Sequence, residues 1–285
     1  MQEVPLPPRA TVNEWFQLVK VCAEFERAPG PVRLVATHCS RFDPLGTTLL
    51  ASAMVKRKGR SAESVEWLPP KDEGASAFLE EIGFNRLAQA RGEDIGAGSL
   101  ALRQMRKLDV MYLKNVSDLI ARNVPGTSDD AAFIIRTCLS ELLQNVVEHS
   151  GSDVGAFIHA RYFAYRRNVQ IAVVDRGIGI PAALRKARVQ GLERQRDADV
   201  LVAAVTRTGL SSRLSGRFGG LGLKLVLDYA RQGGGRLTAI SQGAKVTFDA
   251  KGHRVAANRF YFSGSAIVLD FRPQSQPVDP EATVF

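Results

Sequence analysis

The sequence predicts an α/β (α+β) protein with a smaller N-terminal domain and a larger C-terminal domain. Short apolar runs alternate with segments of helical periodicity, which is typical of strands packed against helices. A glycine-rich stretch of mixed charge between Arg91 and Gly98 interrupts this pattern and predicts a domain boundary. The 285 residues allow two cores, and 45% hydrophobic with 24% charged residues is the composition of a globular protein.

The N-terminal domain is expected over residues 1–95. Thr11 and Glu14 have the spacing of a capping box that opens a helix to about Glu26. A turn at residues 43–46 leads into an apolar helix, because Pro44 and Gly46 are typical turn residues. The expected elements are helices at 11–26, 47–55 and 75–82 and strands at 32–36 and 65–68.

A connecting helix is expected over residues 96–127, and the C-terminal domain over residues 128–285. The helical pattern at 100–123 carries an apolar stripe that could form a homodimer interface or pack against the protein's own domain. The stripe consists of Leu100, Met105, Leu108, Met111 and Leu119. The further expected elements are a helix ending near 149, paired strands at 156–165 and 169–174, a mainly helical insertion at 181–218, a helix at 221–231, and strands at 236–241, 245–250, 258–262 and 265–272.

Apolar runs and cysteines bear on the cellular compartment. No apolar run approaches the roughly 18 residues needed to span a bilayer, so no membrane segment is expected. The first ten residues have no apolar core of a secretory signal. The cysteines are scattered in apolar stretches without metal-ligand spacing and are interpreted as buried thiols of a reducing compartment; they are Cys22, Cys39 and Cys138. A cytoplasmic protein is therefore expected.

The positive charge is concentrated in the second part of the chain. Residues 1–95 carry 12 Lys and Arg against 13 Asp and Glu, whereas residues 96–285 carry 26 against 16. A basic region suits a nucleic acid, a triphosphate or an acidic protein partner. Zinc-finger spacing and the aromatic-basic pattern of RNA-binding sheets are missing from the sequence, so nucleic acid has no specific support.

The first motif that carries chemistry lies on the helix ending near 149. Glu141, Asn145 and His149 are spaced by four residues and share one face of that helix. An asparagine oxygen can bind Mg²⁺ without adding charge beside phosphates. A glutamate one turn earlier could orient or deprotonate a nucleophile. Taken alone, the same pattern also fits a solvated helix face.

The second motif follows an apolar strand. Asp175 stands at the strand end and could accept a hydrogen bond from the amino group of adenine. Gly177 and Gly179 would let a flat base approach the backbone, and Ile180 follows them. An ordinary turn at a strand end is the alternative. A dinucleotide-binding fingerprint fits poorly, because Pro181 stands where its third glycine should be.

The third motif is a glycine-rich loop that runs directly into an apolar helix. Such a loop presents free backbone N–H groups and the positive end of a helix to an anion. It differs from a Walker loop, because Leu225 rather than Ser or Thr follows Lys224. A flexible linker is the alternative. The residues singled out are Gly219, Gly220, Leu221, Gly222 and Leu223.

Together, the three motifs resemble the N, G1 and G2 boxes of the GHKL (Bergerat-fold) ATPase superfamily, in the same order and over about residues 128–272. The resemblance implies a C-terminal two-layer α/β sandwich with a mixed sheet and a helical lid that binds Mg-ATP. It implies that Asn145 coordinates Mg²⁺, that Asp175 binds the adenine amino group and that Glu141 is the base. His149 would contact a phosphate or polarise that network. The segments at 177–180 and 219–223 would surround the nucleotide.

The insertion between the second and third motifs resembles the ATP lid of this superfamily. Residues 181–218 carry 8 Lys and Arg against 3 Asp and Glu, so this segment should be attracted to a triphosphate. Arg213 and Arg217 are the candidates for contact with the γ-phosphate. A solvated face of the lid is the alternative for both arginines.

The N-terminal domain resembles a STAS domain, the fold of anti-anti-sigma factors, at residues 42–47 and 78–84. Members of that family carry a phosphorylated serine in an Asp-Ser-Ser-Gly turn. Pro44 and Leu45 replace both serines here, so the phosphorylation switch is expected to be lost unless Thr47 or Thr48 substitutes for it.

These features predict a regulatory ATP-binding protein with a protein partner. The chain lacks a His-Glu-x-x-x-Pro phosphoacceptor setting, which disfavours two-component autophosphorylation. Transfer of phosphate to a protein Ser/Thr, as by an anti-sigma-type kinase, or slow hydrolysis would use Glu141. The alternative without catalysis is an interaction module that ATP switches through its lid. A nucleic-acid-associated ATPase is a third hypothesis.

Overall fold

The computed structural model describes residues 1–60, 64–89, 102–123, 129–146, 150–207, 222–232 and 234–272. Its N-terminal part contains a parallel three-stranded sheet of order β1-β3-β5 and a parallel pair, β2-β4. The strands are β1 (Gln2–Pro5), β2 (Arg9–Ala10), β3 (Val32–Val35), β4 (Arg41–Phe42) and β5 (Val65–Leu68). The helices are α1 (Trp15–Arg27), α2 (Pro44–Arg60), α3 (Glu73–Glu81) and α4 (Phe84–Gln89).

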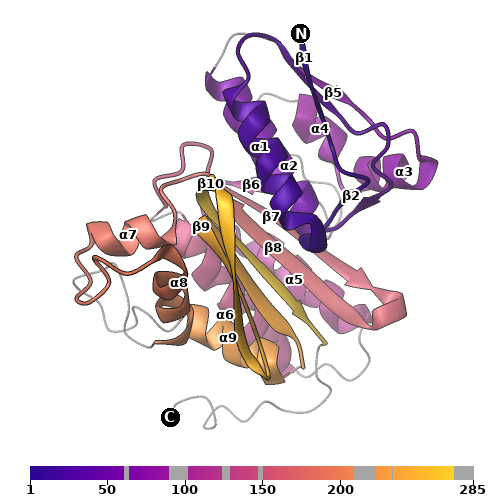
Figure 1. Ribbon diagram of the computed structural model, residues 1–285. Helices are drawn as coiled ribbons and strands as arrows, with labels where there is room; N and C mark the ends of the chain where they lie inside the picture. Colours follow the sequence, from indigo (N-terminus) through magenta and orange to yellow (C-terminus); the bar gives the residue numbers. More distant parts are fainter. Residues whose placement is uncertain are drawn as a thin grey trace.

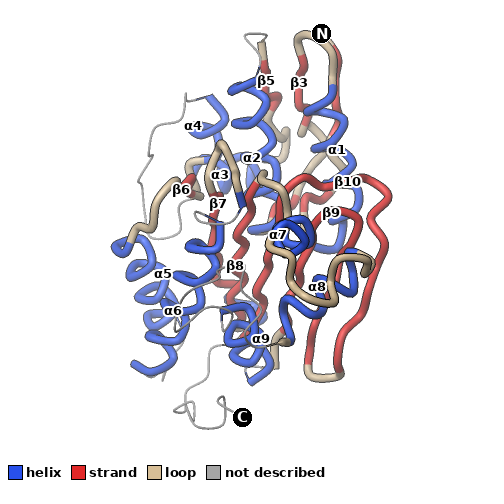
Figure 2. Tube along the Cα trace, turned by 90° about the vertical axis from the view of Figure 1, so that its left-hand side faces the viewer, coloured by secondary structure: helices blue, strands red, loops and turns tan. Residues whose placement is uncertain are grey.

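A five-stranded sheet of order β6-β7-β8-β10-β9 forms the centre of the C-terminal part, and each neighbouring pair is antiparallel. Its strands are β6 (Arg103–Met105), β7 (Ala156–Phe163), β8 (Asn168–Asp175), β9 (Arg236–Asp249) and β10 (Gly252–Phe271). Figure 2 shows α5, α6 and α9 side by side along this sheet. The helices of this part are α5 (Val110–Asn123), α6 (Asp129–Asn145), α7 (Ile180–Lys186), α8 (Asp197–Thr206) and α9 (Gly222–Gln232). The α/β class is confirmed, but the mixed sheet expected for the C-terminal domain is wrong, because all four pairs of the described strands are antiparallel.

Both faces of the five-stranded sheet are covered by helices. Successive side chains of a strand point to opposite faces, and the two cores follow this alternation. Val173 packs in the core shared with α5, α6, α8 and α9. Val174 packs in the other core, together with residues of α1 and α2. Figure 1 shows α1 and α2 between the N-terminal strands and the larger sheet.

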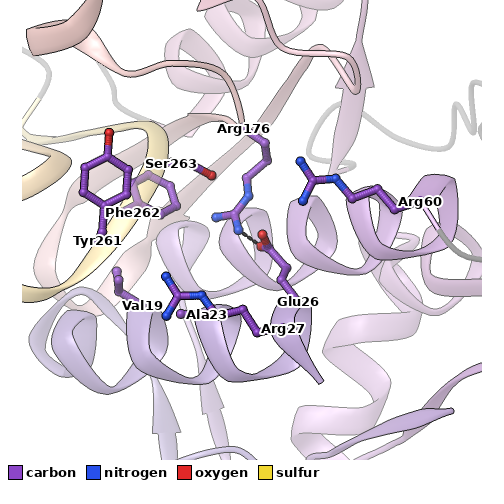
Figure 3. Close-up of a pocket in the computed structure, with 9 residues that line it drawn as sticks. All are labelled: Val19, Ala23, Glu26, Arg27, Arg60, Arg176, Tyr261, Phe262 and Ser263. Atoms are coloured by element: carbon purple, nitrogen blue, oxygen red, sulfur yellow. Dashed lines mark ion pairs between the residues drawn. The ribbon is translucent and has the colours of Figure 1, made fainter. Parts of the chain in front are cut away.

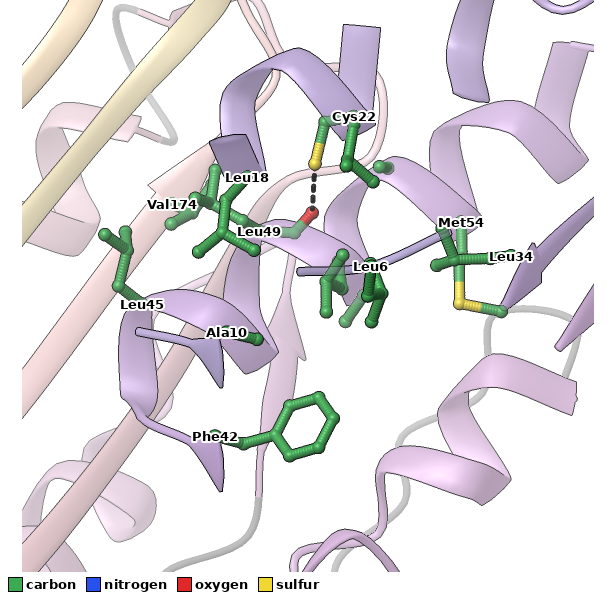
Figure 4. Packing of buried hydrophobic residues seen from close by; sticks show 14 of the residues in the cluster. Leu6, Ala10, Leu18, Cys22, Leu34, Phe42, Leu45, Leu49, Met54 and Val174 are labelled. Carbon is green, nitrogen blue, oxygen red and sulfur yellow. Dashed lines mark hydrogen bonds between the residues drawn. The ribbon is translucent and has the colours of Figure 1, made fainter. Parts of the chain in front are cut away.

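Helix α2 is buried on all sides over most of its length because it lies between two sheets. Its residues from Pro44 to Met54 are all buried, and it packs against β7 and β8 on one side and β2 and β5 on the other. A helix that is apolar around its whole circumference is expected to be buried in this way. Figure 4 shows Leu45 beside Val174 of β8, and the Cys22 thiol of α1 donating a hydrogen bond to the Leu49 carbonyl oxygen. One apolar core therefore joins the N-terminal part to the sheet.

The start of the first helix differs from the prediction. The Thr11 hydroxyl donates to the Glu14 side chain instead of capping a backbone N–H, and a 3₁₀ turn at Val12–Glu14 precedes α1. The carboxylate of buried Asp43 performs the capping: it accepts hydrogen bonds from the Val12 N–H (2.7 Å) and the Gly46 N–H (3.0 Å). The predicted turn at 43–46 is thus the first turn of α2, and burial raises the pKa of Asp43 to about 6.

Three predictions on the C-terminal part were wrong in detail. The helix expected at 100–123 begins at Val110, because Arg103–Met105 pair with β7 as an edge strand. Its apolar stripe is divided accordingly: Met105 is buried in the strand, whereas Leu108 and Met111 are exposed. The four closing strands are two long ones, β9 and β10, which pair across bulges.

The predicted insertion at 181–218 is helical over α7 and α8, as expected, and α8 packs firmly on the sheet. Leu201 and Val205 of α8 are fully buried in the same core as α6 and α9. The Asp197 carboxylate holds the first turn of α8 to β9 by accepting from the Gly243 N–H (3.0 Å). The interpretation of the whole insertion as an ATP lid stays a prediction, since residues 208–221 lie outside the described residues.

The predicted burial of the three cysteines agrees with the structure. Cys22, Cys39 and Cys138 are all buried, and burial raises the pKa of each thiol. Over the described ranges, none of the helices has the length and apolar character required to cross a membrane.

Candidate functional site

The end of α6 lies next to the end of β8. After α6 the chain turns into β7, whose first residue Ala156 pairs with Asp175, the last residue of β8. The Ser150 carbonyl oxygen accepts a hydrogen bond from the Ile178 N–H (2.8 Å) in the loop that follows β8. The first and second predicted motifs therefore meet at one end of the sheet, where β8 ends.

The start of α9 points towards the same end of the sheet. Only a few residues separate the end of α9 from Arg236, the first residue of β9. Arg236 pairs with Asp270 of β10, and Asp270 pairs with Gln170 near the start of β8. The end of α9 therefore lies at the level where β8 starts. Since α9 packs on β9, the helix runs antiparallel to the strand that follows it. Eleven residues of helix span about 16 Å, roughly the length of strand between Gln170 and Asp175. Gly222, the first residue of α9, is therefore brought to the Asp175 end of the sheet.

The Asp175 side chain faces the helical layer of the sheet. It alternates with Val174 along β8 and so lies on the face that carries α6 and α9. The side chain is 3% exposed, and one carboxylate oxygen accepts from the Gly177 N–H (2.8 Å). Burial raises the pKa of Asp175 to about 6, although hydrogen bonds from Gly177 and Ser265 and the nearby Lys56 act in the opposite direction.

The two glycines after Asp175 are required by the protein's own packing. A Cβ atom at Gly177 would lie 1.9 Å from the Ser150 carbonyl oxygen, and one at Gly179 would lie 2.6 Å from the Ser241 Oγ. Gly179 also has a φ of +84°, which favours glycine. The Ile180 N–H donates to the Ser241 (3.1 Å) and Ser265 (3.2 Å) hydroxyls. The loop is thus fixed between the end of α6 and strands β9 and β10.

The remaining predicted site residues divide into two groups. Glu141 is half-buried and Asn145 is exposed on the last turns of α6, while Ile180 and Leu223 are half-buried against the helix-side core. The others lie outside the described residues; they are His149, Arg213, Arg217, Gly219, Gly220 and Leu221.

Sequence reasoning missed the residues that hold the Asp175 loop in place. Ser150, Ser241 and Ser265 do so from three different elements, and their separation along the chain hides the cluster. Lys56 of α2 reaches the same loop from the N-terminal part, where its ammonium donates to the Arg176 carbonyl oxygen (2.9 Å). The sequence carries no clear signal for this contact, because Lys56 begins the basic run that ends α2.

This arrangement of helices, strand end and glycine loop has a counterpart among known families. Residues 130–254 match the family of histidine kinase-, DNA gyrase B- and HSP90-like ATPases. This part of the chain is a GHKL ATPase domain. A comparison with curated proteins gave no match.

The GHKL domain includes all three motifs. The match starts in α6, contains the Asp175 loop and α9, and ends in β10. The sheet continues beyond it, because Ala266–Phe271 pair with β8, and β6 adds an edge strand from upstream. Its polar groups suit a nucleotide with a hard cation: a carboxylate that can accept from an amino group, an exposed amide oxygen that can bind Mg²⁺, and a helix start that can donate to an anion.

Proposed function

We propose that the protein is a regulator that binds Mg-ATP at the end of the sheet where the end of α6, the end of β8 and the start of α9 meet. The observation that supports this most strongly is Asp175, a buried carboxylate that faces the helical layer at the point where the three motifs converge. In this proposal Asp175 accepts from the adenine amino group, Ile180 and Leu223 contact the nucleotide, and Asn145 coordinates Mg²⁺. The N-terminus of α9 would face the phosphates.

Glu141 is the proposed general base. It lies one turn before Asn145 on α6 and is half-buried, so its carboxylate is on the same side of the helix as the proposed Mg²⁺ ligand. Phosphoryl transfer depends mainly on positioning and on electrostatic stabilisation by the cation. The proposed reactions are transfer of the γ-phosphoryl group to a protein Ser/Thr, as by an anti-sigma-type kinase, or slow hydrolysis.

The N-terminal part is proposed to regulate this domain and to engage a protein partner. Under the STAS-like interpretation, Thr47 or Thr48 would have to replace the missing phosphoacceptor serine. Both side chains are completely buried, and the Thr47 hydroxyl lies 2.7 Å from Nδ1 of His159 in β7. A kinase therefore has no access to either hydroxyl in this conformation, which favours regulation by packing over regulation by phosphorylation at this turn. The buried thiols suit a reducing cytoplasm.

The decisive experiment is calorimetric titration with ATP, with and without Mg²⁺, followed by a hydrolysis and phosphotransfer assay on the same sample. Asp175→Ala should abolish ATP binding, and Asn145→Ala should abolish the contribution of Mg²⁺. Gln144→Ala, which removes the neighbouring amide of α6, is the matched control and should bind as wild type does. Wild-type protein that does not bind ATP would refute the proposal.

Glu141→Ala distinguishes the enzyme from the switched interaction module. If Glu141 is the base, this variant should bind ATP normally and lose phosphate release or transfer. In the alternative, a nucleotide-gated module, the wild type has no turnover to lose, and ATP changes partner binding equally in wild type and Glu141→Ala. Turnover that is unchanged in Glu141→Ala would refute its role as base.

A further inference from the structure

A small cavity lies on the face of the sheet opposite to the candidate nucleotide site. It has a volume of about 150 Å³ and is lined by α1, the end of α2, Arg176 of the Asp175 loop and residues 261–263 of β10. Its polar walls are Glu26, Arg27, Arg60, Arg176 and Ser263. Figure 3 shows the guanidinium of Arg176 between Glu26 of α1 and the aromatic rings of the hairpin.

Arg176 is the central residue of this cavity. It follows Asp175 directly and therefore points to the opposite face, towards α1 and α2. The side chain is 4% exposed, lies over the Phe262 ring at 4.8 Å and forms an ion pair with Glu26 through Nη2. Its Nε and Nη1 atoms have no hydrogen-bond partner among the residues that the structure describes. Burial lowers the pKa of Arg176 to about 10, so the group remains a cation at neutral pH, with three N–H donors on these two nitrogens unused.

The charges of the cavity favour an anion. Three arginines and one glutamate line it, which leaves a net charge of +2. Arg27 and Arg60 are exposed at its rim, in the last turns of α1 and α2. Cations are common at helix C-termini, so the position of these two arginines has an ordinary explanation. Arg176 has no such explanation, because it lies on a loop and is buried, where unsatisfied donors are costly.

Ser263 supplies a further donor. Its Oγ atom accepts a hydrogen bond from the Lys56 ammonium at 3.2 Å, and Lys56 also donates to the Arg176 carbonyl oxygen. A hydroxyl that accepts from an ammonium keeps its own hydrogen available to donate. The cavity therefore presents the guanidinium groups of Arg27 and Arg60 and the Ser263 hydroxyl, while the Nε and Nη1 atoms of Arg176 are buried in its wall and add positive charge from there.

We propose that this cavity binds a small phosphate-bearing anion, either inorganic phosphate or a compact phosphate monoester. The net charge of +2 matches a phosphate monoester, which carries about −1.5 to −2 at neutral pH. The volume is about half of the roughly 300 Å³ at which ligand pockets for drug-sized molecules begin. A compact anion therefore suits this cavity better than a whole nucleotide. Bidentate recognition of phosphate is a characteristic role of arginine.

This proposal does not depend on ATP binding, because the cavity and the nucleotide site lie on opposite faces of the sheet. The test is calorimetric titration of the full chain with inorganic phosphate and, separately, with O-phosphoserine, against chloride and acetate at equal ionic strength. We expect both phosphates to bind and the two controls not to bind. The phosphate that binds with the higher affinity shows whether the free ion or the monoester is the preferred ligand.

Variants at the rim locate the site. Arg27→Ala and Arg60→Ala should each weaken phosphate binding about tenfold, the effect of losing one charge-assisted hydrogen bond. Arg166→Ala, which removes an exposed arginine from the opposite end of β8, is the matched control and should leave the affinity unchanged. Asn145→Ala should also leave it unchanged, which separates this cavity from the nucleotide site.

Glu26→Gln provides a test with the opposite sign. It removes the negative charge that competes for Arg176, so phosphate should bind more tightly than in wild type, provided that a melting curve shows a folded protein. If that variant is unfolded, the rim variants decide alone. Equal phosphate affinity in wild type, Arg60→Ala and Arg166→Ala would overturn the proposal, and so would a wild type that binds neither phosphate.

Discussion

His159 connects the two parts of the molecule and should make their association sensitive to acid. It lies on β7, is completely buried and shares a 2.7 Å hydrogen bond with Thr47 of α2. The Phe78 ring of α3 lies nearby. Burial, together with the charge of Arg161, lowers the pKa of His159 from 6.5 to about 3. Protonation in the folded state would leave an uncompensated cation in the shared core.

The size of the effect follows from the two pKa values. The unfolded chain binds a proton near pH 6.5 and the folded chain only near pH 3, so the stability due to neutral His159 is present above about pH 6.5 and is lost as the pH falls. Between pH 7 and pH 5 this loss amounts to about 2 kcal/mol. Asp43 and Asp175 act in the opposite sense, because their raised pKa values make each contribute about 1 kcal/mol as the pH falls over the same range.

Because these contributions partly cancel, the total pH dependence of stability is uninformative and a difference must be measured. We expect the free energy of unfolding of His159→Gln, by denaturant titration, to lose about 2 kcal/mol less than wild type between pH 7 and pH 5. His38→Gln, a substitution on the surface, should follow wild type. Parallel pH curves for wild type and His159→Gln would show that His159 is not kept neutral by the fold.

Three further results are expected. Gly177→Ala should lower the free energy of unfolding by about 2 kcal/mol in denaturant titrations, because its Cβ meets the Ser150 carbonyl oxygen. Gly59→Ala is the control: it lies in open space on α2 and should stabilise the protein by up to about 1 kcal/mol. Equal effects of the two substitutions would contradict the packing around Gly177. The affinity for ATP should fall as Asp175 is protonated below about pH 6, which calorimetry at several pH values checks; a flat profile would exclude this carboxylate as the acceptor. Thr47→Val should cost about 1–3 kcal/mol by thermal unfolding, since it leaves His159 without its partner. Thr48→Val should cost less, because that hydroxyl bonds only to carbonyls of its own helix, and equal costs would argue against the bond.

The C-terminal domain could be predicted from sequence because its signals are local. The apolar period of α9, the paired strands β7 and β8, and the motif around Asp175 each appear within at most 20 consecutive residues. The convergence of the three motifs depends instead on strand pairing, such as Ala156 with Asp175, which the sequence does not display directly. Family resemblance supplied that information.

The elements that were missed depend on distant partners. β1 contains only one buried residue, Val4, and is a strand because it pairs with β3. β6 becomes a strand because the edge of β7 is available, although its sequence continues a helical pattern. β9 extends through Gly243 because β10 continues beside it. The uniform apolarity of α2 from Pro44 to Met54 was a usable signal, since it predicts contacts on every side.

The position of α2 has a practical consequence for anyone who wishes to divide this protein. A cut between residues 89 and 102 looks natural from the sequence, yet the fragments would not be independent. The C-terminal fragment with the GHKL domain would expose Phe157, Val174 and Val268 to water. Together they form part of a contiguous apolar surface of the kind that causes aggregation. Over the described residues, α1 and α2 pack directly against the sheet, so a structural change in one part would reach the other by repacking of these buried side chains.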